Sequence, residues 1–292
     1  MRGASNVLQC GLSSNPSSAA AMPPRRHGTQ SLERAALLLR ELAAREQFGW
    51  RLRDLAQRCG LEHATAHRML QCLVRERLVR QRPGDRHYLP GPLLFELGLG
   101  LSAHGGFQAA CRPVVNRLSR QHAALAVAYL RSGSEFVCLA RAGPSVYLGT
   151  ALAVGTRRPM MTTAGGVAML ISMPPAEAAA IVAHNLRQLQ VMGGAVTRRL
   201  ETFYRRSLAL GYAFNRGETT RDVHSLGVPV RDANGAAFAA VVVAGRAEDF
   251  PEARVAAVVE RLRAEAELLE REARRLELDA VLPDRAEAPR PG

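Results

Sequence analysis

The feature that most constrains this chain is a glycine turn at Gly60-Leu61, which separates two short amphipathic stretches. Apolar residues at helical spacing give each stretch one inward side, formed by Leu55, Ala56 and Cys59 before the turn and by Ala66, Leu70 and Leu73 after it. Two short helices joined through a glycine turn are typical of a helix-turn-helix. We therefore predict that a second helix, over residues 62–77, follows the turn directly.

A basic hairpin is predicted after these helices. The strand-like segments 78–82 and 86–89 flank Pro83-Gly84-Asp85, which forms a compact turn. Upstream, apolar residues recur at helical spacing behind Ser31, a suitable N-cap for a first helix. A helix, a helix-turn-helix and a hairpin in this order predict a winged helix-turn-helix domain over residues 30–90.

The rest of the chain alternates between helical and strand-like segments. Leucines at helical spacing predict a linker helix over 91–105, which ends at Gly105-Gly106. Beyond it, residues 106–278 predict an α+β domain in which one antiparallel sheet carries helices against it. Its expected helices cover 107–122, 163–172, 175–184, 197–210 and a long segment from Pro251, and its expected strands cover 123–131, 135–142, 146–151, 212–217, 224–231 and 236–245. The ends, 1–29 and 279–292, lack apolar periodicity and predict disordered tails.

Composition narrows the class of protein only in part. Apolar residues make up 47% of the chain, and neither a membrane-spanning apolar run nor an export signal occurs, so we expect a cytoplasmic protein without a membrane partner. The net charge of +13 favours a polyanionic partner. However, all 39 basic residues are arginine, which a GC-rich coding bias also produces, so the charge is weak support. The five cysteines form no CxxC pair and indicate neither a zinc ribbon nor a disulfide framework.

The helix after the glycine turn has a polar side opposite its apolar one. We expect this side to carry Ala64, His67, Arg68, Gln71 and Arg75. A helix in a major groove contacts base edges near its start, while basic groups around it hold phosphates. The base-edge candidates are His63, Ala64, Thr65 and His67, and the phosphate candidates are Arg68, which could also bond guanine, Arg82 and Arg86. A merely solvated face is the alternative, but segment 31–90 also carries twelve arginines against seven acidic residues, a net charge of +5.

Seven motifs resemble the IclR family of bacterial regulators. They are Ser31-Leu-Glu-Arg-Ala-Ala, Gly60-Leu-Glu-His-Ala-Thr-Ala-His-Arg-Met-Leu, Tyr88-Leu-Pro-Gly, Gly155-Thr-Arg-Arg-Pro, Gly165-Gly-Val-Ala-Met-Leu, Gly211-Tyr-Ala and Leu226-Gly-Val-Pro-Val, and the match covers about residues 31–275. The resemblance implies a transcription regulator that binds double-stranded DNA and carries a GAF-like effector domain. It also implies a homodimer formed through the DNA-binding half, or a dimer of dimers, controlled by a small organic or aromatic acid.

Three positions depart from the pattern of that family. Arg77 stands where the family often has glycine, and because a left-handed backbone is costly for arginine we expect a different turn there. Arg53 stands where the second helix usually has a Ser or Thr cap, and the family's basic residue near the start of the recognition helix is shifted or replaced around Glu62-His63. Operator preference therefore does not follow from the resemblance.

An effector site is expected at another helix start. Residues 160–166 precede an apolar run, and free N–H groups at a helix start attract anions, although an ordinary capped helix is the alternative. The resemblance implies a second wall on the last two strands, where valine and alanine favour an effector with a sizeable apolar part, an aromatic or medium-chain acid. The candidate effector-binding residues are Met160, Thr163, Gly165, Gly166, Ser225, Val242 and Ala244. Arg157 and Arg158 could pair with a carboxylate but are more typical of an exposed surface.

Motifs for catalysis or metal binding find little support. The segment Gly98-Leu-Gly-Leu-Ser-Ala103 matches a loose dinucleotide-binding pattern, but the residues before it predict a helix where that motif needs a strand. His63 and His67 have metal-ligand spacing, yet Ala64 replaces the glutamate of a zinc peptidase and no third ligand suggests itself. We therefore expect no catalytic residues, no cofactor and no metal. A small-molecule sensor that acts through protein partners is the alternative function.

Overall fold

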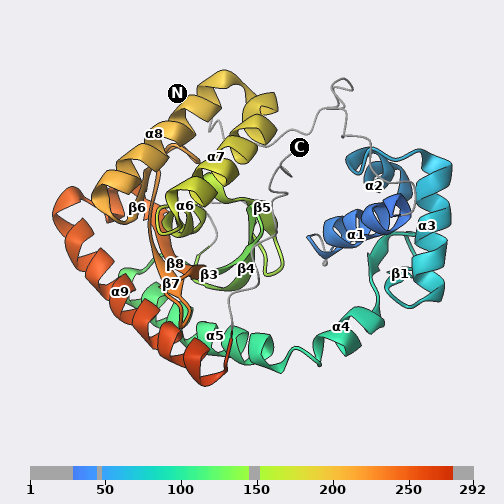
Figure 1. Cartoon of the computed structure of the whole chain (residues 1–292), viewed down its shortest axis with the longest axis horizontal. Helices are drawn as coiled ribbons and strands as arrows, with labels where there is room; N and C mark the ends of the chain where they lie inside the picture. Colours follow the sequence, from blue (N-terminus) through green and yellow to red (C-terminus); the bar gives the residue numbers. More distant parts are fainter. Residues whose placement is uncertain (1–28, 45–47, 145–151, 279–292) are drawn as a thin grey trace, which may run out of the picture.

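The computed structural model describes residues 29–44, 48–144 and 152–278, which form two bodies joined by a helical linker (Figure 1). Three expectations fall on other residues. The predicted strand over 146–151 and both predicted tails, 1–29 and 279–292, lie outside the described residues except for Thr29.

The N-terminal body is a winged helix-turn-helix, as predicted. It contains α1 (Gln30–Ala43), α2 (Leu52–Arg58), α3 (His63–Arg75), β1 (Val79–Gln81) and β2 (Tyr88–Pro90). Its core combines Leu38 and Leu42 of α1 with Leu55 of α2 and Leu70 of α3, all fully buried. The cap of α1 is Thr29 rather than the predicted Ser31, which lies inside the helix because Glu33 N–H already donates to the Thr29 carbonyl at 3.0 Å.

The turn after α3 keeps the left-handed backbone that we did not expect of arginine. Arg77 has φ +59°, so the prediction of a different turn is wrong. Two contacts hold this residue in place: its carbonyl accepts the N–H of Leu93 at 3.1 Å, and its guanidinium pairs with Glu96 at 2.5 Å. Gly91 is also required here, since a Cβ on it would lie 2.1 Å from the Arg77 carbonyl oxygen.

The linker helix expected over 91–105 and the helix expected over 107–122 are both present, but the break between them falls earlier than at Gly105-Gly106. They are α4 (Pro92–Gly98) and α5 (Ser102–His122), so the break falls at residues 99–101. Gly105 and Gly106, expected to end the linker, lie inside α5. A Cβ on Gly106 would lie 3.0 Å from Leu276, so this glycine allows close helix packing and does not mark a chain break.

The C-terminal body is built on the predicted antiparallel sheet, which has six strands. In spatial order these are β5 (Arg157–Pro159), β4 (Glu135–Ala142), β3 (Leu125–Ser132), β8 (Ala237–Arg246), β7 (Val223–Arg231) and β6 (Ala213–Arg216). The hairpin predicted over 233–235 joins β7 to β8. Gly235 takes φ +80° in this turn, and the Asp232 carboxylate accepts the N–H groups of Asn234 and Ala236.

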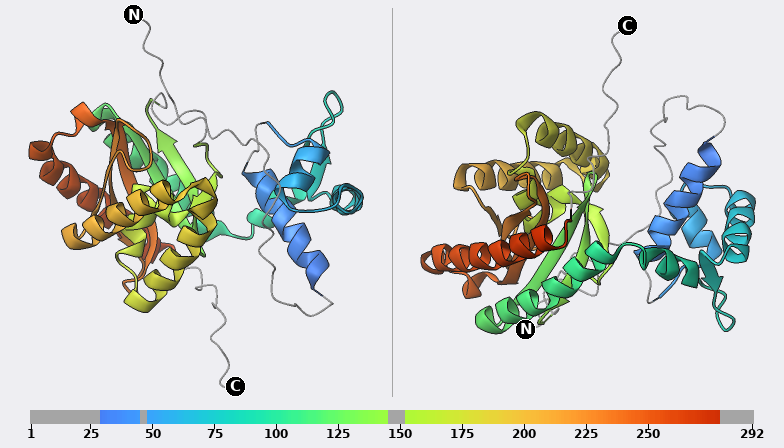
Figure 2. Two further views of the ribbon diagram at one scale, coloured as in Figure 1. Left: turned by 90° about the horizontal axis from the view of Figure 1, so that it is seen from above. Right: turned by 60° about the horizontal axis from the view of Figure 1, so that its bottom comes forward.

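Helices cover both faces of this sheet (Figure 2). One face packs against α5 and α9 (Glu252–Arg275), and the other packs against α6 (Ala164–Leu170), α7 (Pro175–Leu189) and α8 (Gly194–Leu210). Alternation along β8 sends Val241 and Val243 to the first face and Val242 to the second. We call the second side the α6 face.

Candidate nucleic-acid interface and effector site

The polar side of α3 lies in solvent, as its periodicity predicts. Ala66, Leu70 and Leu73 are buried against the rest of the winged domain. The opposite side exposes His63, Ala64, His67, Arg68 and Arg75, with Thr65 and Gln71 half-buried beside them. Six of the eight DNA-binding candidates therefore lie on one helix, α3. This helix lies at the outer edge of the N-terminal body (Figure 1). We call this surface the recognition face.

The two wing candidates differ in their surroundings. Arg86 is exposed at the tip of the hairpin and has φ +58°. Arg82 instead donates to the Asp85 carboxylate at 2.8 Å and reaches the Phe48 carbonyl at 3.4 Å. The N–H of His87 donates to the same carboxylate at 3.1 Å, which lowers the pKa of Asp85 and keeps it ionised. A phosphate contact from Arg82 would therefore be made beside a negative charge.

The effector candidates come together on the α6 face of the sheet. Ser225 and Ala244 are cross-strand partners on β7 and β8, and Val242 lies two residues before Ala244 on the same side. Met160 is fully buried below α6, and Thr163 occupies the N-cap position of that helix. Residues from three distant parts of the sequence thus line one region.

The two candidate glycines have a packing role in this region. A Cβ on Gly165 would lie 2.3 Å from the Tyr129 ring and 3.0 Å from Val242. A Cβ on Gly166 would lie 2.0 Å from the Met160 carbonyl oxygen. Because all of α6 is buried, Gly165 lets the helix lie directly on the sheet, and Gly166 lets it lie against the Met160 backbone. The polar groups of the region include the side chains of Thr163 and Ser225 and the hydroxyl of Tyr129.

Comparison with known proteins decides the family. The model of the bacterial transcriptional regulator IclR C-terminal domain matches residues 104–271, and that of the IclR helix-turn-helix domain matches residues 31–83. The chain belongs to the IclR family. It is therefore a DNA-binding transcription regulator with a C-terminal effector domain, and membership confirms that it is not an enzyme.

Relatives cover most of this IclR-family chain. It is 32% identical over 228 residues to the glycerol operon regulatory protein of Streptomyces griseus, and the alignment covers 75% of this chain and 85% of the relative. An IclR family transcriptional regulator from Brucella abortus superposes with a TM-score of 0.66 at 20% identity, covering 86% and 95% of the two chains. An IclR homologue from Microbacterium hydrocarbonoxydans, solved in complex with 4-hydroxybenzoate, gives 0.64 at 21%, covering 84% and 99%. These two structures support the fold.

Sequence reasoning missed several basic side chains of this IclR-family winged domain. Arg51 and Arg53 are exposed at the start of α2, and Arg80 is exposed on β1. The cap position that we assigned to Arg53 belongs to Arg51, since α2 begins at Leu52 and Leu55 N–H donates to the Arg51 carbonyl. Arginines beside a helix start were the available signal, because free N–H groups there also attract phosphate.

Tyr129 is the residue that was missed on the α6 face. It is buried beneath Gly165, and its hydroxyl shares a hydrogen bond with Thr163. Burial raises the pKa of this phenol, so it stays protonated at neutral pH. Alternation along β3 from Leu125 and Val127, both in the same core, was the available signal.

Arg157 is already engaged elsewhere in this regulator. Its guanidinium pairs with Glu135 at 3.0 Å and donates to the Ser132 hydroxyl at 2.9 Å. Arg158 is exposed. Neither arginine is therefore placed to pair with the carboxylate of a buried ligand.

Two further observations concern the described residues of the chain. Within them, no group of three His, Cys, Asp or Glu side chains could hold a metal ion. The pair His63 and His67 therefore has no third ligand among the described residues. No helix in the same ranges is long and apolar enough to cross a membrane.

Proposed function

We propose that the recognition face of α3 enters the major groove of double-stranded DNA. In this arrangement His63, Ala64, Thr65 and His67 meet base edges, Arg68 contacts a guanine or a phosphate, and Gln71 lies at the edge of the contact. Arg86 and Arg82 hold phosphates from the wing. The observation that carries the proposal is the exposure of Arg68 and its neighbours on a helix whose other side is fixed in the core.

We also propose that the regulator acts as a dimer formed through its linker, with a dimer of dimers as the larger assembly. The linker exposes apolar side chains in succession: Phe95 is 71% exposed, Leu97 60%, Leu99 65% and Leu101 57%. A run of this kind is typical of a protein interface, because a monomer rarely leaves so much apolar surface in water. Two copies joined there would present two recognition helices to two half-sites.

The substitution Leu97→Glu tests the dimer. A buried, unpaired carboxylate would destabilise the interface strongly, so light scattering should report a monomer at micromolar concentration. The control is Leu208→Glu on α8, where the leucine is 55% exposed but lies outside the linker, and this variant should keep the mass of the native protein. Equal masses for the two variants would contradict the proposal that the linker forms the dimer interface.

The effector that we propose is a small organic acid with an apolar part, aromatic or medium-chain. Val242 and Ala244 supply an apolar wall, while Thr163 and Ser225 supply the few polar groups. Met160, Gly165 and Gly166 shape the site by holding α6 against the sheet. The binding of 4-hydroxybenzoate by the Microbacterium homologue supports this class of ligand.

Binding to selected DNA in the presence of acids tests the whole proposal. Fragments enriched from a random duplex library would be titrated with the full chain at several salt concentrations, because phosphate contacts weaken steeply as salt rises. We expect an aromatic or medium-chain acid, but not acetate or glyoxylate, to change the DNA affinity, and Ser225→Ala to weaken that response. If only two- or three-carbon acids act, the proposed effector class is wrong.

The alternative function is a sensor that acts only through protein partners. It predicts that an acid binds and raises the melting temperature of the protein, while no salt-dependent DNA binding occurs. Because the proposed partner is chromosomal DNA, we expect the regulator to act in the cytoplasm of a bacterium.

A further inference from the structure

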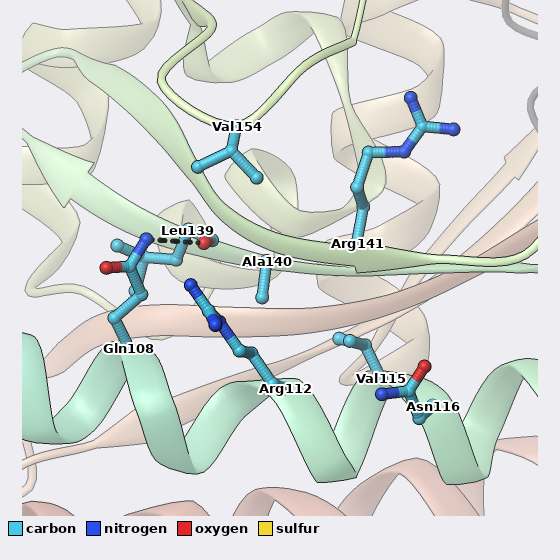
Figure 3. Close-up of a pocket in the computed structure, with 8 residues that line it drawn as sticks. All are labelled: Gln108, Arg112, Val115, Asn116, Leu139, Ala140, Arg141 and Val154. Carbon is cyan, nitrogen blue, oxygen red and sulfur yellow. Dashed lines mark hydrogen bonds between the residues drawn. The ribbon is translucent and has the colours of Figure 1, made fainter.

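A pocket lies on the opposite side of the sheet from the α6 face. It opens between the middle of α5 and strand β4 and has a volume of about 280 Å³ (Figure 3). This volume lies near the lower end of the range for small-molecule sites, so it suits a ligand of one ring or a short chain.

The walls of this pocket combine polar residues, Arg141 of β4 among them, with an apolar surface. Gln108, Arg112 and Asn116 come from α5 at intervals of four residues, which places them on one side of that helix. The apolar part is formed by Val115 of α5, Leu139 and Ala140 of β4, and Val154. Such a lining suits a ligand with one polar end and one apolar end.

Arg112 is the cation that points into the pocket. In Figure 3 its side chain rises from α5 toward β4 into the space between them. Within the described ranges, no ion pair or hydrogen bond of its guanidinium occurs, and no carboxylate lines the pocket. The neighbouring Arg141 points away from α5 and donates to the Leu152 carbonyl at 2.6 Å. Arg112 therefore holds an uncompensated positive charge beside apolar side chains.

We propose that this pocket binds a small organic monocarboxylate, as a site separate from the effector site of the α6 face. The carboxylate pairs with Arg112 in a two-pronged hydrogen bond, and the Asn116 amide lies one helical turn away. Gln108 keeps its place by donating to the Leu139 carbonyl at 3.0 Å. The apolar part of the ligand covers Val115, Ala140 and Val154.

Occupation of this pocket would act on the linker. The α5 helix begins at Ser102, directly after residues 99–101, and Arg112 lies at its middle. A ligand that bridges α5 and β4 favours one placement of α5 on the sheet, and with it one direction of the linker that leads to α4 and the winged domain. A ligand in this pocket would thus be a second signal that controls the position of the winged domain.

Methyl NMR of the full chain with benzoate and hexanoate tests the site, and neutral benzamide serves as the matched probe without charge. We expect saturable shifts of the methyl signals of Val115, Leu139 and Val154 with at least one acid, and none with benzamide. The variant Arg112→Gln should raise the Kd of that acid at these signals at least about tenfold, which matches the loss of a charge-assisted hydrogen bond. Its melting temperature should not change, because Arg112 is exposed.

Signals on the other face separate this inference from the proposed function. Shifts confined to Val167 and Val242 of the α6 face would overturn the second site while leaving the effector proposal standing. Shifts at Val115 that Arg112→Gln leaves unchanged would also overturn it, as would the absence of any shift at Val115 with both acids. Shifts at Val115 that depend on Arg112, with none at Val242, would support the second site alone.

Discussion

The recognition face on α3 and the α6 face of the sheet hold their candidate residues in opposite environments. On α3, His67 and Arg68 stand in solvent, and only the other side of the helix supports the fold. On the α6 face, Gly165 and Val242 lie in close packing between helix and sheet, and Gly166 lies against the backbone of Met160. The difference predicts that substitutions on the exposed side of α3 leave the fold unchanged, whereas substitutions on the α6 face alter the fold as well.

The largest effect is expected from Gly166→Ala on the α6 face. The new Cβ would lie 2.0 Å from the Met160 carbonyl oxygen, a backbone atom that cannot move aside. We expect the free energy of unfolding to fall by about 3 kcal/mol or more, and the melting temperature by about 6 to 12 °C. Calorimetry measures this fall.

The matched control is Gly105→Ala, also inside a helix, where a Cβ would meet nothing within 4 Å. This change should stabilise the chain by about 0.5 to 1 kcal/mol, because alanine is the better helix former. A Gly166→Ala protein as stable as the Gly105→Ala protein would break the comparison between the two faces.

The next effect is expected from Arg68→Ala on the recognition face. Loss of one arginine contact should weaken binding to the selected DNA by about 10- to 100-fold while the melting temperature stays the same. Fluorescence anisotropy gives the affinity. Arg68→Lys keeps the charge but not the planar fork, so a variant that recovers full affinity would identify a phosphate contact instead of a guanine contact.

The smallest effects are expected from Arg86→Gly and Arg77→Gly, two substitutions at left-handed arginines. Both should relieve backbone strain of about 1 kcal/mol, with Arg77→Gly gaining less because it also loses the Glu96 pair. Only Arg86→Gly should weaken DNA binding, and it should reduce the slope of log affinity against log salt by about 1. An equal change in slope for both variants would show that the wing tip has no special role.

Periodicity predicted what depends on local spacing. The inward side of α3, the hairpin at 233–235 and the antiparallel sheet all follow from patterns within a few residues of one another. The packing role of Gly106 and Gly165 did not follow, because Leu276 and Tyr129, which they approach, are distant in sequence. A glycine pair signals either a chain break or a close approach, and only the partner decides which.

The presence of basic side chains in the wing was likewise predictable, but their ion-pair partners were not. Arg82 and Arg86 are equivalent in the sequence, yet Arg82 bonds Asp85 and Arg86 lies in solvent. Pairing depends on side-chain directions in a three-dimensional turn, which composition does not contain. Tyr129 was missed for a related reason, since its hydrogen bond to Thr163 joins two segments far apart in the chain.

Selection of DNA from a random duplex library, run in parallel for the native chain and a His67→Ala-Arg68→Ala variant, tests the central claim most directly. We predict that the native chain enriches one sequence with two related half-sites, and that the variant, with an unchanged melting temperature and mass, enriches none. Enrichment of the same sequence with the same affinity by the variant would contradict the claim that α3 reads the DNA.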